Sequence, residues 1–419
     1  MPLLRNWRKK PVTKNSEKRV PALRFKGFTN DWEQRKLGTA IKIIKDKNKN
    51  QHSYRAFSIS NIKGFIAQDE QFGKDNTYSK TDKSTNYIVK PGMFAYNPAR
   101  INVGSIAYQN QTEPVLVSSL YEIFQTNSKI DDSFLMNWFK TSLFNRQIKR
   151  LEEGGVRQYF FIDKMKETEI KLPSISEQNQ ISKLLQLVNK NLDLQQRKLN
   201  ELKEVKKTLL SQLFPSKGQY RPIIRFKKFT NKWTKRKLGN IAKIIGGGTP
   251  STSNHDYWNG NINWYSPTEI GNNIFVNSSN KKISIKGLNN SSAKLLPGGK
   301  TILFTSRAGI GNMAIMLTDG CTNQGFQSWV IDDTKIDIYF LYSLGRLLKH
   351  DAIRQASGST FLEISNKEVK KLLLEIPSFT EQKLIGNMLR KIDDDIVRQK
   401  ERIILITKIK KNFLQKLFV

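Results

Sequence analysis

The sequence predicts a protein of the α/β (α+β) class, with two pseudo-twofold-related globular units separated by an antiparallel coiled coil of two long helices. Three observations support this prediction: an internal repeat, a long heptad-patterned segment at the end of each copy, and short strand-like runs between turn residues within each copy. The chain has 419 residues, enough for several domains. Its hydrophobic content of 38% and charged content of 26% are typical of globular proteins.

The repeat is clearest at the start of each copy. Residues 21–45 recur as residues 222–246 with an offset of 201, and fifteen of the twenty-five aligned positions are identical. The shared pattern R-F-x-x-F-x-x-x-W-x-x-x-K-L-G includes Trp32 and Trp233, which we expect in the core because large aromatic side chains near the start of a domain usually pack there. Chance does not produce so dense a match, so the chain is a tandem duplication.

A second match closes each copy. The motif PSISEQ at 173–178 recurs as PSFTEQ at 377–382 with an offset of 204, and a weaker match between the two ends pairs Arg100 with Arg307. The predicted domains are a basic N-terminal arm (1–20), a first globular unit (21–172), a central long helix (173–214), a linker (215–221), a second globular unit (222–376) and a distal long helix (377–419).

The segments that follow these closing motifs are predicted to be helices. Ser174 to Glu177 and Ser378 to Glu381 have the form of a capping box. Apolar residues then recur with a period of 3.5, which favours a coiled coil over an ordinary helix pair at a domain edge. The predicted coiled-coil and partner interface consists of Leu185, Val188, Leu192, Gln195, Leu199, Leu202, Lys206, Leu389, Ile392, Ile396, Gln399, Ile403, Ile406 and Lys410.

Polar residues interrupt the two seams at matching steps. Gln195 and Lys206 stand in the first helix, and Gln399 and Lys410 stand in the second. Polar seam residues cost stability and fix the register and orientation of the helices. Each helix of about 38 residues would be roughly 55–60 Å long.

Within the globular units, short apolar runs alternate with turn residues, which indicates strands. Examples are Tyr87–Val89, Val115–Val117, Thr301–Phe304 and Met313–Met316. A helical stretch follows late in each unit, at Ser133–Arg150 and at Ile338–Ala356. These patterns predict a curved or partly closed sheet in each unit.

The charge of the chain points to an anionic partner. Lys and Arg number 71 and Asp and Glu 36, which gives a net charge of +35. Such a chain repels itself unless it binds an anion, and nucleic acid fits better than an acidic membrane surface because of the doubled architecture. The single cysteine, Cys321, excludes an intrachain disulfide and fits a cytoplasmic location. No apolar run approaches a membrane span, and no Cys/His cluster suggests a metal site.

The two copies of the repeat match at their beginnings and ends but differ in their middle segments. Residues 46–85 share little with residues 247–290, which suits two readers of different sequences rather than one palindromic reader. If the helices run antiparallel, the two units lie at their opposite ends, roughly one to two DNA turns apart. The helices would then act as a ruler for a bipartite DNA site with a fixed spacer.

The doubled pattern P-x-L/I-R-F-x-x-F…W…K-L-G, then P-G…R…G, then P-S-x-x-E-Q resembles the specificity (S) subunit of type I restriction-modification systems, and the segment 246–267 resembles an opening common in its target-recognition domains. The resemblance implies two target-recognition domains that each read half of an asymmetric double-stranded DNA site. It also implies two methyltransferase subunits docked on the helices and a restriction/translocase subunit in the assembly. S-adenosylmethionine, ATP and Mg²⁺ would bind to those partners, and this chain would hold no cofactor.

The candidate DNA-contacting residues lie on turns and small-residue loops. Base edges are read by side chains with hydrogen-bond donors and acceptors, whereas lysines and arginines also contact phosphates. Tyr265 and its neighbour Trp264 either stack on bases or pack in the interior. Arg100 and Arg307 either contact DNA or are ordinary solvated surface charges. The candidates are Asn97, Arg100, Arg157, Gln158, Tyr159, Tyr265, Ser306, Arg307, Ser359 and Thr360.

The sequence indicates no catalytic activity of its own. The glycine pattern at 309–314 has no βαβ context, and no triad or metal constellation stands out. An RNA-binding or ribosome-associated structural protein with a coiled-coil arm is the alternative function, although the two repeat units of equal length disfavour it. The bases read and the spacer length do not follow from the sequence.

Overall fold

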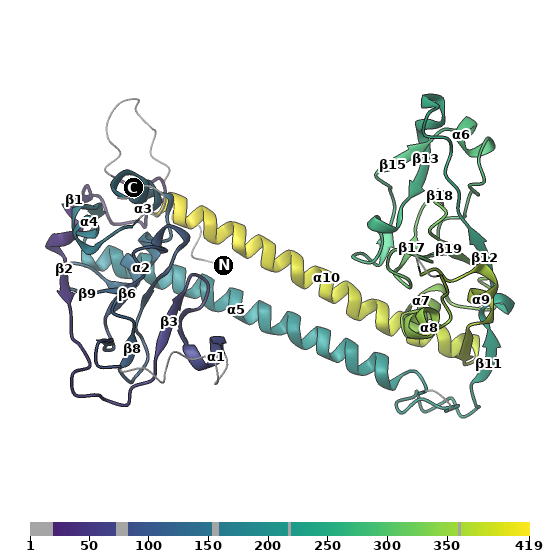
Figure 1. Ribbon diagram of the computed structural model, residues 1–419, viewed down its shortest axis with the longest axis horizontal. Helices are drawn as coiled ribbons and strands as arrows, with labels where there is room; N and C mark the ends of the chain where they lie inside the picture. The colour runs from purple at the N-terminus through teal and green to yellow at the C-terminus, as the bar shows by residue number, and fades with distance from the viewer. Residues whose placement is uncertain (1–19, 73–82, 153–158, 217–218, 359–361) are drawn as a thin grey trace. The chain divides into compact units, whose positions relative to one another are not determined.

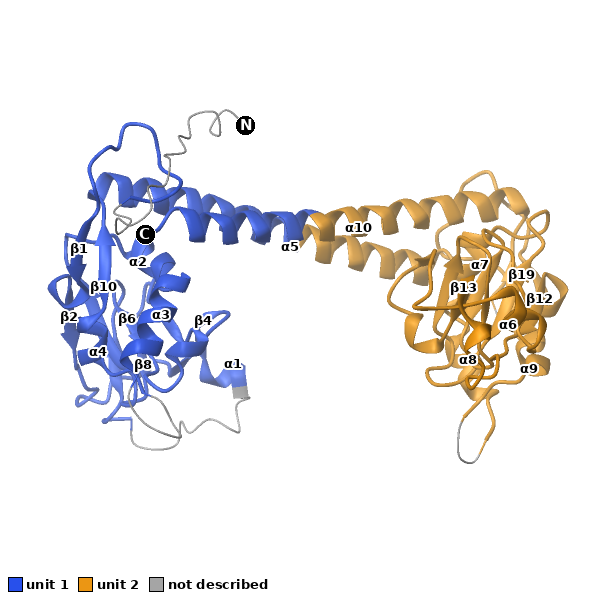
Figure 2. Ribbon diagram, turned by 90° about the horizontal axis from the view of Figure 1, so that it is seen from above, with its two compact units in different colours: residues 1–196, 402–419 blue, residues 197–401 orange. Residues whose placement is uncertain are grey.

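The computed structural model describes residues 20–72, 83–152, 159–216, 219–358 and 362–419 (Figure 1). They form two compact units, which we call unit 1 (residues 1–196 and 402–419) and unit 2 (residues 197–401) (Figure 2). The two long helices are α5 (Ile175–Gln212) and α10 (Phe379–Lys416), each of 38 residues. Each of them begins in one unit and ends in the other.

Unit 1 is built on a four-stranded antiparallel sheet with the order β2-β9-β6-β7. Every residue of β6 is buried, so this strand is covered on both faces. The strands of unit 1 are β1 (Glu33–Lys36), β2 (Ile41–Ile44), β3 (Phe57–Ser60), β4 (Gly64–Ala67), β5 (Tyr87–Val89), β6 (Phe94–Tyr96), β7 (Ile106–Tyr108), β8 (Val115–Val117), β9 (Glu122–Thr126) and β10 (Glu169–Leu172). Its short helices are α1 (Gln68–Phe72), α2 (Asp132–Trp138), α3 (Ser142–Leu151) and α4 (Ile162–Glu167).

Unit 2 repeats the frame of unit 1. Its main sheet has the order β12-β19-β16-β17-β14, in which the first four strands are antiparallel neighbours and β14 joins β17 in parallel. Its strands are β11 (Thr234–Lys237), β12 (Ala242–Gly246), β13 (Trp258–Tyr265), β14 (Phe275–Val276), β15 (Lys281–Ile283), β16 (Thr301–Phe304), β17 (Met313–Met316), β18 (Gly320–Thr322), β19 (Gln327–Ile331) and β20 (Leu373–Ile376). Its short helices are α6 (Ile285–Asn289), α7 (Ile338–Gly345), α8 (Lys349–Arg354) and α9 (Asn366–Lys371).

Several expectations from the sequence are confirmed at the level of single elements. The four strand-like runs named above are β5, β8, β16 and β17. The unlike middles of the repeat also fold differently: residues 46–85 supply the hairpin β3–β4 with α1, whereas residues 247–290 supply β13, β14, β15 and α6, with β13 also pairing with the later strand β18.

The two late helical stretches are each broken, contrary to the single helices expected at 133–150 and 338–356. In unit 1 the break lies between α2 and α3, where the Thr141 side chain accepts a hydrogen bond from the Phe144 backbone and starts a new helix. In unit 2 the chain turns after Gly345, which packs so closely on the Trp329 ring that a Cβ there would lie 2.8 Å from it. Periodicity alone did not reveal either break.

The repeated glycine of the K-L-G motif permits a close approach between segments. A Cβ on Gly38 would lie 2.9 Å from the Lys166 Cβ of α4, and a Cβ on Gly239 would lie 3.0 Å from the Lys370 Cβ of α9. Any side chain at these glycines would push the helix away. The repeat of the glycine is therefore explained by packing.

The ends of the long helices complete the cores. In unit 1, Ile181 and Leu185 of α5 lie in one hydrophobic cluster with Leu417 and Phe418, which follow α10. In unit 2, Leu213 at the end of α5 lies in a cluster with Ile385 and Leu389 of α10. Trp32 and Trp233 belong to these two clusters, as expected of core residues.

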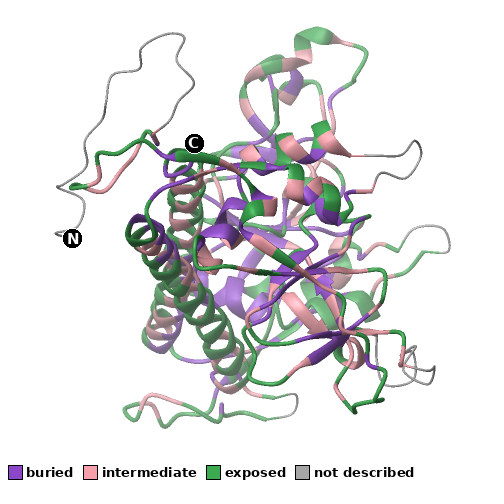
Figure 3. Ribbon diagram, turned by 90° about the vertical axis from the view of Figure 1, so that its left-hand side faces the viewer, coloured by how far each residue is buried: buried purple, intermediate pink, exposed green. Residues whose placement is uncertain are grey.

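The seam predicted from the heptads is the protected side of the helices. In unit 2, Lys206 of α5 contacts Asp393 of α10, and Leu213 shares a cluster with Ile385, so the two segments run antiparallel. All fourteen predicted seam residues are buried or half-buried, whereas many other positions of the two helices are exposed (Figure 3). The predicted arm at 1–20 lies outside the described residues except for Val20, as do two residues of the predicted linker, 217–218.

Candidate nucleic-acid interface

In unit 1 the predicted residues Asn97 and Arg100 lie on the turn between β6 and β7. The turn is held by hydrogen bonds from the Asn97 backbone N–H to the Ser105 carbonyl and from the Arg100 N–H to the Asn97 carbonyl, each of 3.0 Å. The Asn97 side-chain oxygen accepts a third bond, from the Ala99 N–H, at 3.0 Å. The Arg100 side chain is exposed and forms no ion pair with any described residue, so it is available to an anion.

In unit 2 the matching turn between β16 and β17 carries Ser306 and Arg307. The Thr305 hydroxyl donates to the Gly309 carbonyl at 2.7 Å, and Ala308 and Gly309 have φ of 51° and 107°, so the turn is tightly wound. The half-buried Arg307 lines a cavity of about 690 Å³ together with Ile310, Ile353, Leu362 and Glu363. Arg307 therefore remains partly exposed where it lines the cavity.

The predicted small-residue loops are at 154–159 and 358–360, and the described residues that follow each of them contact the arginine turn of their own unit. Arg157, Gln158, Ser359 and Thr360 themselves lie outside the described residues. Just beyond the first loop, the Phe160 N–H donates to the Pro98 carbonyl of the β6–β7 turn at 3.0 Å. Just beyond the second loop, the Ile364 N–H donates to the Ser306 carbonyl at 3.0 Å. The same juxtaposition therefore occurs in both units.

Tyr159 and Ser306 are less exposed than Arg100. Tyr159 is half-buried, and its ring stacks on Phe161 with centroids 5.4 Å apart. Ser306 is fully buried and contacts Glu363 Oε1 at 3.2 Å. Because Ser306 has no exposed surface, its role in this structure is to tie the turn to the segment around Glu363.

Tyr265 and Trp264 pack in the interior rather than presenting their rings to solvent. Tyr265 is fully buried in a cluster with Phe326 and Met316. Trp264 donates its indole N–H to the Gly248 carbonyl at 2.9 Å. The structure therefore favours packing over stacking for both aromatic residues.

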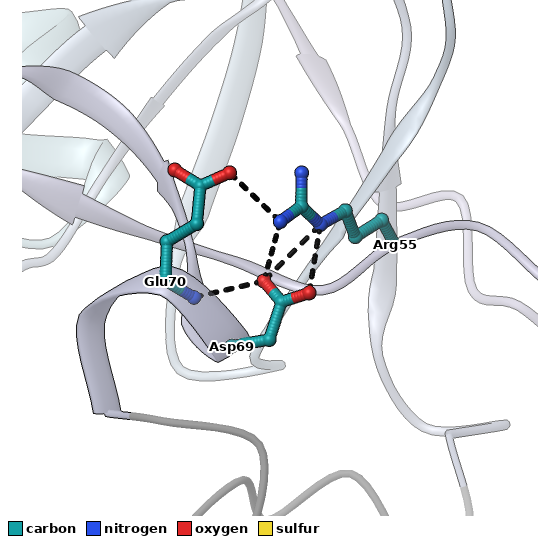
Figure 4. A network of polar contacts seen from close by, with 3 residues as sticks. All are labelled: Arg55, Asp69 and Glu70. Atoms are coloured by element: carbon teal, nitrogen blue, oxygen red, sulfur yellow. Dashed lines mark hydrogen bonds and ion pairs between the residues drawn. The ribbon is translucent and has the colours of Figure 1, made fainter.

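An exposed arginine of unit 1 is already neutralised by its neighbours. Arg55 binds the carboxylates of Asp69 and Glu70 at 2.7 and 2.8 Å, and this network anchors α1 (Figure 4). The hydrogen bond from Arg55 lowers the pKa of Asp69, so this carboxylate stays ionised. Arg55 therefore differs from Arg100, although both side chains are exposed.

The outer faces of the long helices carry apolar residues that the heptad analysis did not single out. Leu185 and its seam neighbours face inward, so they hold the helices together. The exposed apolar side chains of the helix segments in unit 1 are Ile175, Leu187, Leu194, Ile404, Leu405 and Ile409. Apolar residues outside the seam positions were the signal in the sequence that could have revealed this surface.

The described part of the chain shows neither a metal-binding group nor a helix suited to a bilayer. Among those residues, no three or more His, Cys, Asp or Glu side chains gather where they could hold a metal ion. No described helix combines the length and apolar character needed to cross a membrane.

Comparison with solved structures shows a shared fold. The S subunit of a type I restriction-modification system from M. genitalium superimposes with a TM-score of 0.59 at 15% identity, covering 96% of this chain and 99% of that one. The HsdS subunit from Thermoanaerobacter tengcongensis gives a TM-score of 0.50 at 15% identity, covering 92% of this chain and 96% of that one.

Sequence comparison reaches relatives of the same kind. The MjaIX specificity subunit of Methanocaldococcus jannaschii is 32% identical over 195 residues, which span 46% of this chain and 45% of that protein. The putative MjaX specificity subunit of the same organism is 23% identical over 89% of both chains. The family described as "Type I restriction modification DNA specificity domain" matches twice, at residues 29–204 and 230–407. Because these two matches cover most of the sequence and both copies of the repeat, the chain belongs to the type I restriction modification DNA specificity family.

Proposed function

We propose that this chain is the DNA-specificity subunit of a type I restriction-modification complex and that each globular unit reads one half of an asymmetric bipartite site. The observation that carries the proposal is the repeated placement of Arg100 and Arg307 on matched turns, each beside the end of a small-residue loop. The frames are alike and the inserts differ, so the two units present different side chains to DNA. Base contacts from unlike side chains specify unlike half-sites.

The long helices set the spacer between the two half-sites. Two features support this: α5 and α10 each begin in one unit and end in the other, and their seam residues are protected. A coiled coil resists bending better than a flexible linker does, so it suits a fixed separation.

The chemistry of modification and restriction belongs to the partner subunits. We place two methyltransferase subunits on the helices, where Leu194 and Ile404 are exposed by 61% and 55%. Exposed apolar side chains on a helix face are typical of protein–protein contacts. S-adenosylmethionine, ATP and Mg²⁺ would serve the methyltransferase and restriction/translocase subunits, in a complex located in the cytoplasm.

The ruler is tested by lengthening both helices together. One heptad is inserted within 185–206 and another within 389–410, so that the seam pattern is preserved. A heptad adds about 10 Å of helix, so we expect the spacer in sequenced methylation sites to grow by roughly three base pairs.

The matched control inserts a heptad in one helix only, which puts the two seams out of step and should abolish methylation. Unchanged spacing with intact methylation in the double insertion would refute the ruler. Exchanging residues 222–376 for those of a relative should change one half-site and leave the other as it was.

A further inference from the structure

Both units contain a cavity of nearly the same size beside the long helices. The cavity of unit 1, about 840 Å³, lies between the β3–β4 hairpin, the β6–β7 turn, the end of α2 and Lys410 of α10. The cavity of unit 2, about 830 Å³, lies between the segment 271–275, the end of α7 and Lys206 of α5. Lys206 and Lys410 are the seam lysines at matching steps of the repeat, so the two cavities are counterparts.

Each cavity is lined by several cations, among them two at matching positions of the repeat. Lys410 shares the first cavity with Lys140, and Lys206 shares the second with Arg346; Lys140 and Arg346 follow α2 and α7 at matching positions. Lys140 keeps an exposed surface, yet the protein atoms around its amine lower its pKa, and the positive charge of Lys410 lowers it further. Two cations that line the same cavity repel each other unless an anion lies between or beside them.

Unit 2 supplies that anion from its own chain. The Asp393 carboxylate accepts a hydrogen bond from Lys206 Nζ at 2.5 Å and another from the Tyr339 hydroxyl at 2.7 Å. Asp393 is buried, so the bonds to Lys206 and Tyr339 satisfy both of its oxygens away from solvent. The seam lysine of the second cavity is therefore paired with an acid of its own chain.

Unit 1 has no acid in the place of Asp393. The residue at the step of α5 that matches Asp393 is Asn189, and the residue of α2 that matches Tyr339 is Ser133. Lys410 forms no ion pair with any described residue. Asp132 also lines the cavity, but its carboxylate forms no ion pair with Lys140 or Lys410 and accepts hydrogen bonds from the hydroxyls of Thr126 and Tyr108 instead.

We propose that the cavity of unit 1 is a binding site for a DNA backbone phosphate, with Lys140 and Lys410 as its cationic ligands, whereas in unit 2 the matching seam lysine, Lys206, is already bound by Asp393. The inference rests on the proposed function and adds to it a phosphate contact made by one unit only. A phosphate oxygen accepts hydrogen bonds from both ammonium groups and removes their repulsion.

The surroundings of the cavity favour a nucleic-acid phosphate over an acidic protein segment. Asn102 lines the cavity and lies two residues beyond Arg100, so the site continues directly from the candidate base-reading turn. Asn61, Asn110 and Gln111 add side-chain amides, which bind phosphate and sugar oxygens as well as base edges. The net charge of +35 attracts the same polyanion.

The decisive variant installs in unit 1 the acid that unit 2 already has. In Asn189→Asp, the new carboxylate should pair with Lys410 as Asp393 pairs with Lys206. The control is Asn191→Asp on the exposed side of α5, which adds the same charge and keeps an acceptor for the Gln195 amide. Binding of the full chain to a fluorescent DNA duplex is measured by anisotropy across a salt series.

We expect Asn189→Asp to weaken DNA binding and to reduce the slope of log affinity against log salt by about 0.9, the value for one lost phosphate contact. Lys410→Met should do the same. Thermal unfolding of Asn189→Asp should occur at or above the wild-type temperature, which separates the effect from misfolding. A slope equal to that of Asn191→Asp would overturn the phosphate site.

Two further outcomes have distinct meanings. If the wild-type chain shows no salt-dependent binding to duplex DNA, the proposed function itself fails. If the slopes of the two variants are equal and inorganic phosphate stabilises wild type but not Asn189→Asp against heat, the site takes free phosphate and the assignment to DNA is wrong.

Discussion

Arg225 donates two hydrogen bonds of 2.8 Å to the Glu381 carboxylate, from Nε to Oε1 and from Nη2 to Oε2. Arg24 and Glu177 make the same pair of bonds, also of 2.8 Å, in unit 1. These ion pairs join the opening motif of each repeat to its closing motif. The glutamine after each glutamate adds a further contact. Gln178 accepts a hydrogen bond from the backbone at the start of α2, and Gln382 accepts one from the backbone at the start of α7.

The first prediction concerns the ion pair between Arg225 and Glu381. Glu381→Gln leaves Arg225 without a counter-charge in a site that is closed to solvent, because the Glu381 side chain is only 1% exposed. We expect the free energy of unfolding of unit 2 to fall by about 3 kcal/mol. Chemical denaturation should show the loss. Glu33→Gln removes the exposed partner of Arg35 and should change stability by less than about 1 kcal/mol; equal losses in the two variants would contradict the argument.

The second prediction compares the two seam lysines. Lys206→Met leaves the buried Asp393 carboxylate without its counter-charge and should lower the free energy of unfolding by about 3 kcal/mol. Lys410→Met strands no acid and relieves the repulsion on Lys140, so its melting temperature should match or exceed that of wild type. Differential scanning calorimetry of the two variants tests this contrast, and a larger loss in Lys410→Met would refute it.

The third prediction assigns each arginine turn to its own half-site. Arg100→Ala should relax base discrimination in one half of the methylated sequence, and Arg307→Ala in the other, each by about 1–3 kcal/mol per affected base pair. Sequencing of methylated DNA from cells that carry each variant measures this. Arg55→Ala serves as the control, since Arg55 is bound by Asp69 and Glu70. Loss of discrimination in both halves from a single variant would speak against separate readers.

The fourth prediction uses the single cysteine. Cys321 is buried in unit 2, and burial raises the pKa of its thiol to about 12. The thiolate is the reactive form, so alkylation by iodoacetamide at pH 8 should be negligible in the folded chain. The labelling rate should rise about tenfold with each pH unit below 12, because the thiolate fraction does, and it should rise further when unit 2 unfolds. Rapid labelling of native protein at pH 8 would show that the thiol is accessible.

This reagent also separates the two halves of the repeat. Glu381→Gln should accelerate labelling of Cys321, because it weakens unit 2, whereas Glu177→Gln should leave the rate near that of wild type.

The sequence predicted the elements whose patterns are local and repeated. The seam of the long helices followed from a period of 3.5, and β16 and β17 followed from apolar runs bounded by glycine turns. The capping-box form was predictive only in part. Ser174 and Ser378 do accept hydrogen bonds from the backbone of Glu177 and Glu381, but the two glutamates bind Arg24 and Arg225 instead of the helix start. That pairing joins residues far apart in sequence, so no local pattern could reveal it.

The candidate site was predictable only where the two copies align. Arg100 and Arg307 were found from their matching places, and both lie on turns as expected. Tyr265 and Ser306 have residue types that suit DNA contacts, yet the packing of distant strands buries them. Lys140 escaped notice because it follows a short helix whose end the sequence did not mark. Its relation to Lys410 depends on tertiary structure alone.

Unit 2 is one continuous stretch of chain, whereas unit 1 takes residues 402–419 from beyond it. During translation, residues 20–196 emerge from the ribosome first, but Leu417 and Phe418, which fill their core beside Phe134, are synthesised only after all of unit 2. The first-made unit is therefore the last that can finish folding. Until then its unfilled apolar core remains exposed, and chaperones have the longest time to act on the amino-terminal half.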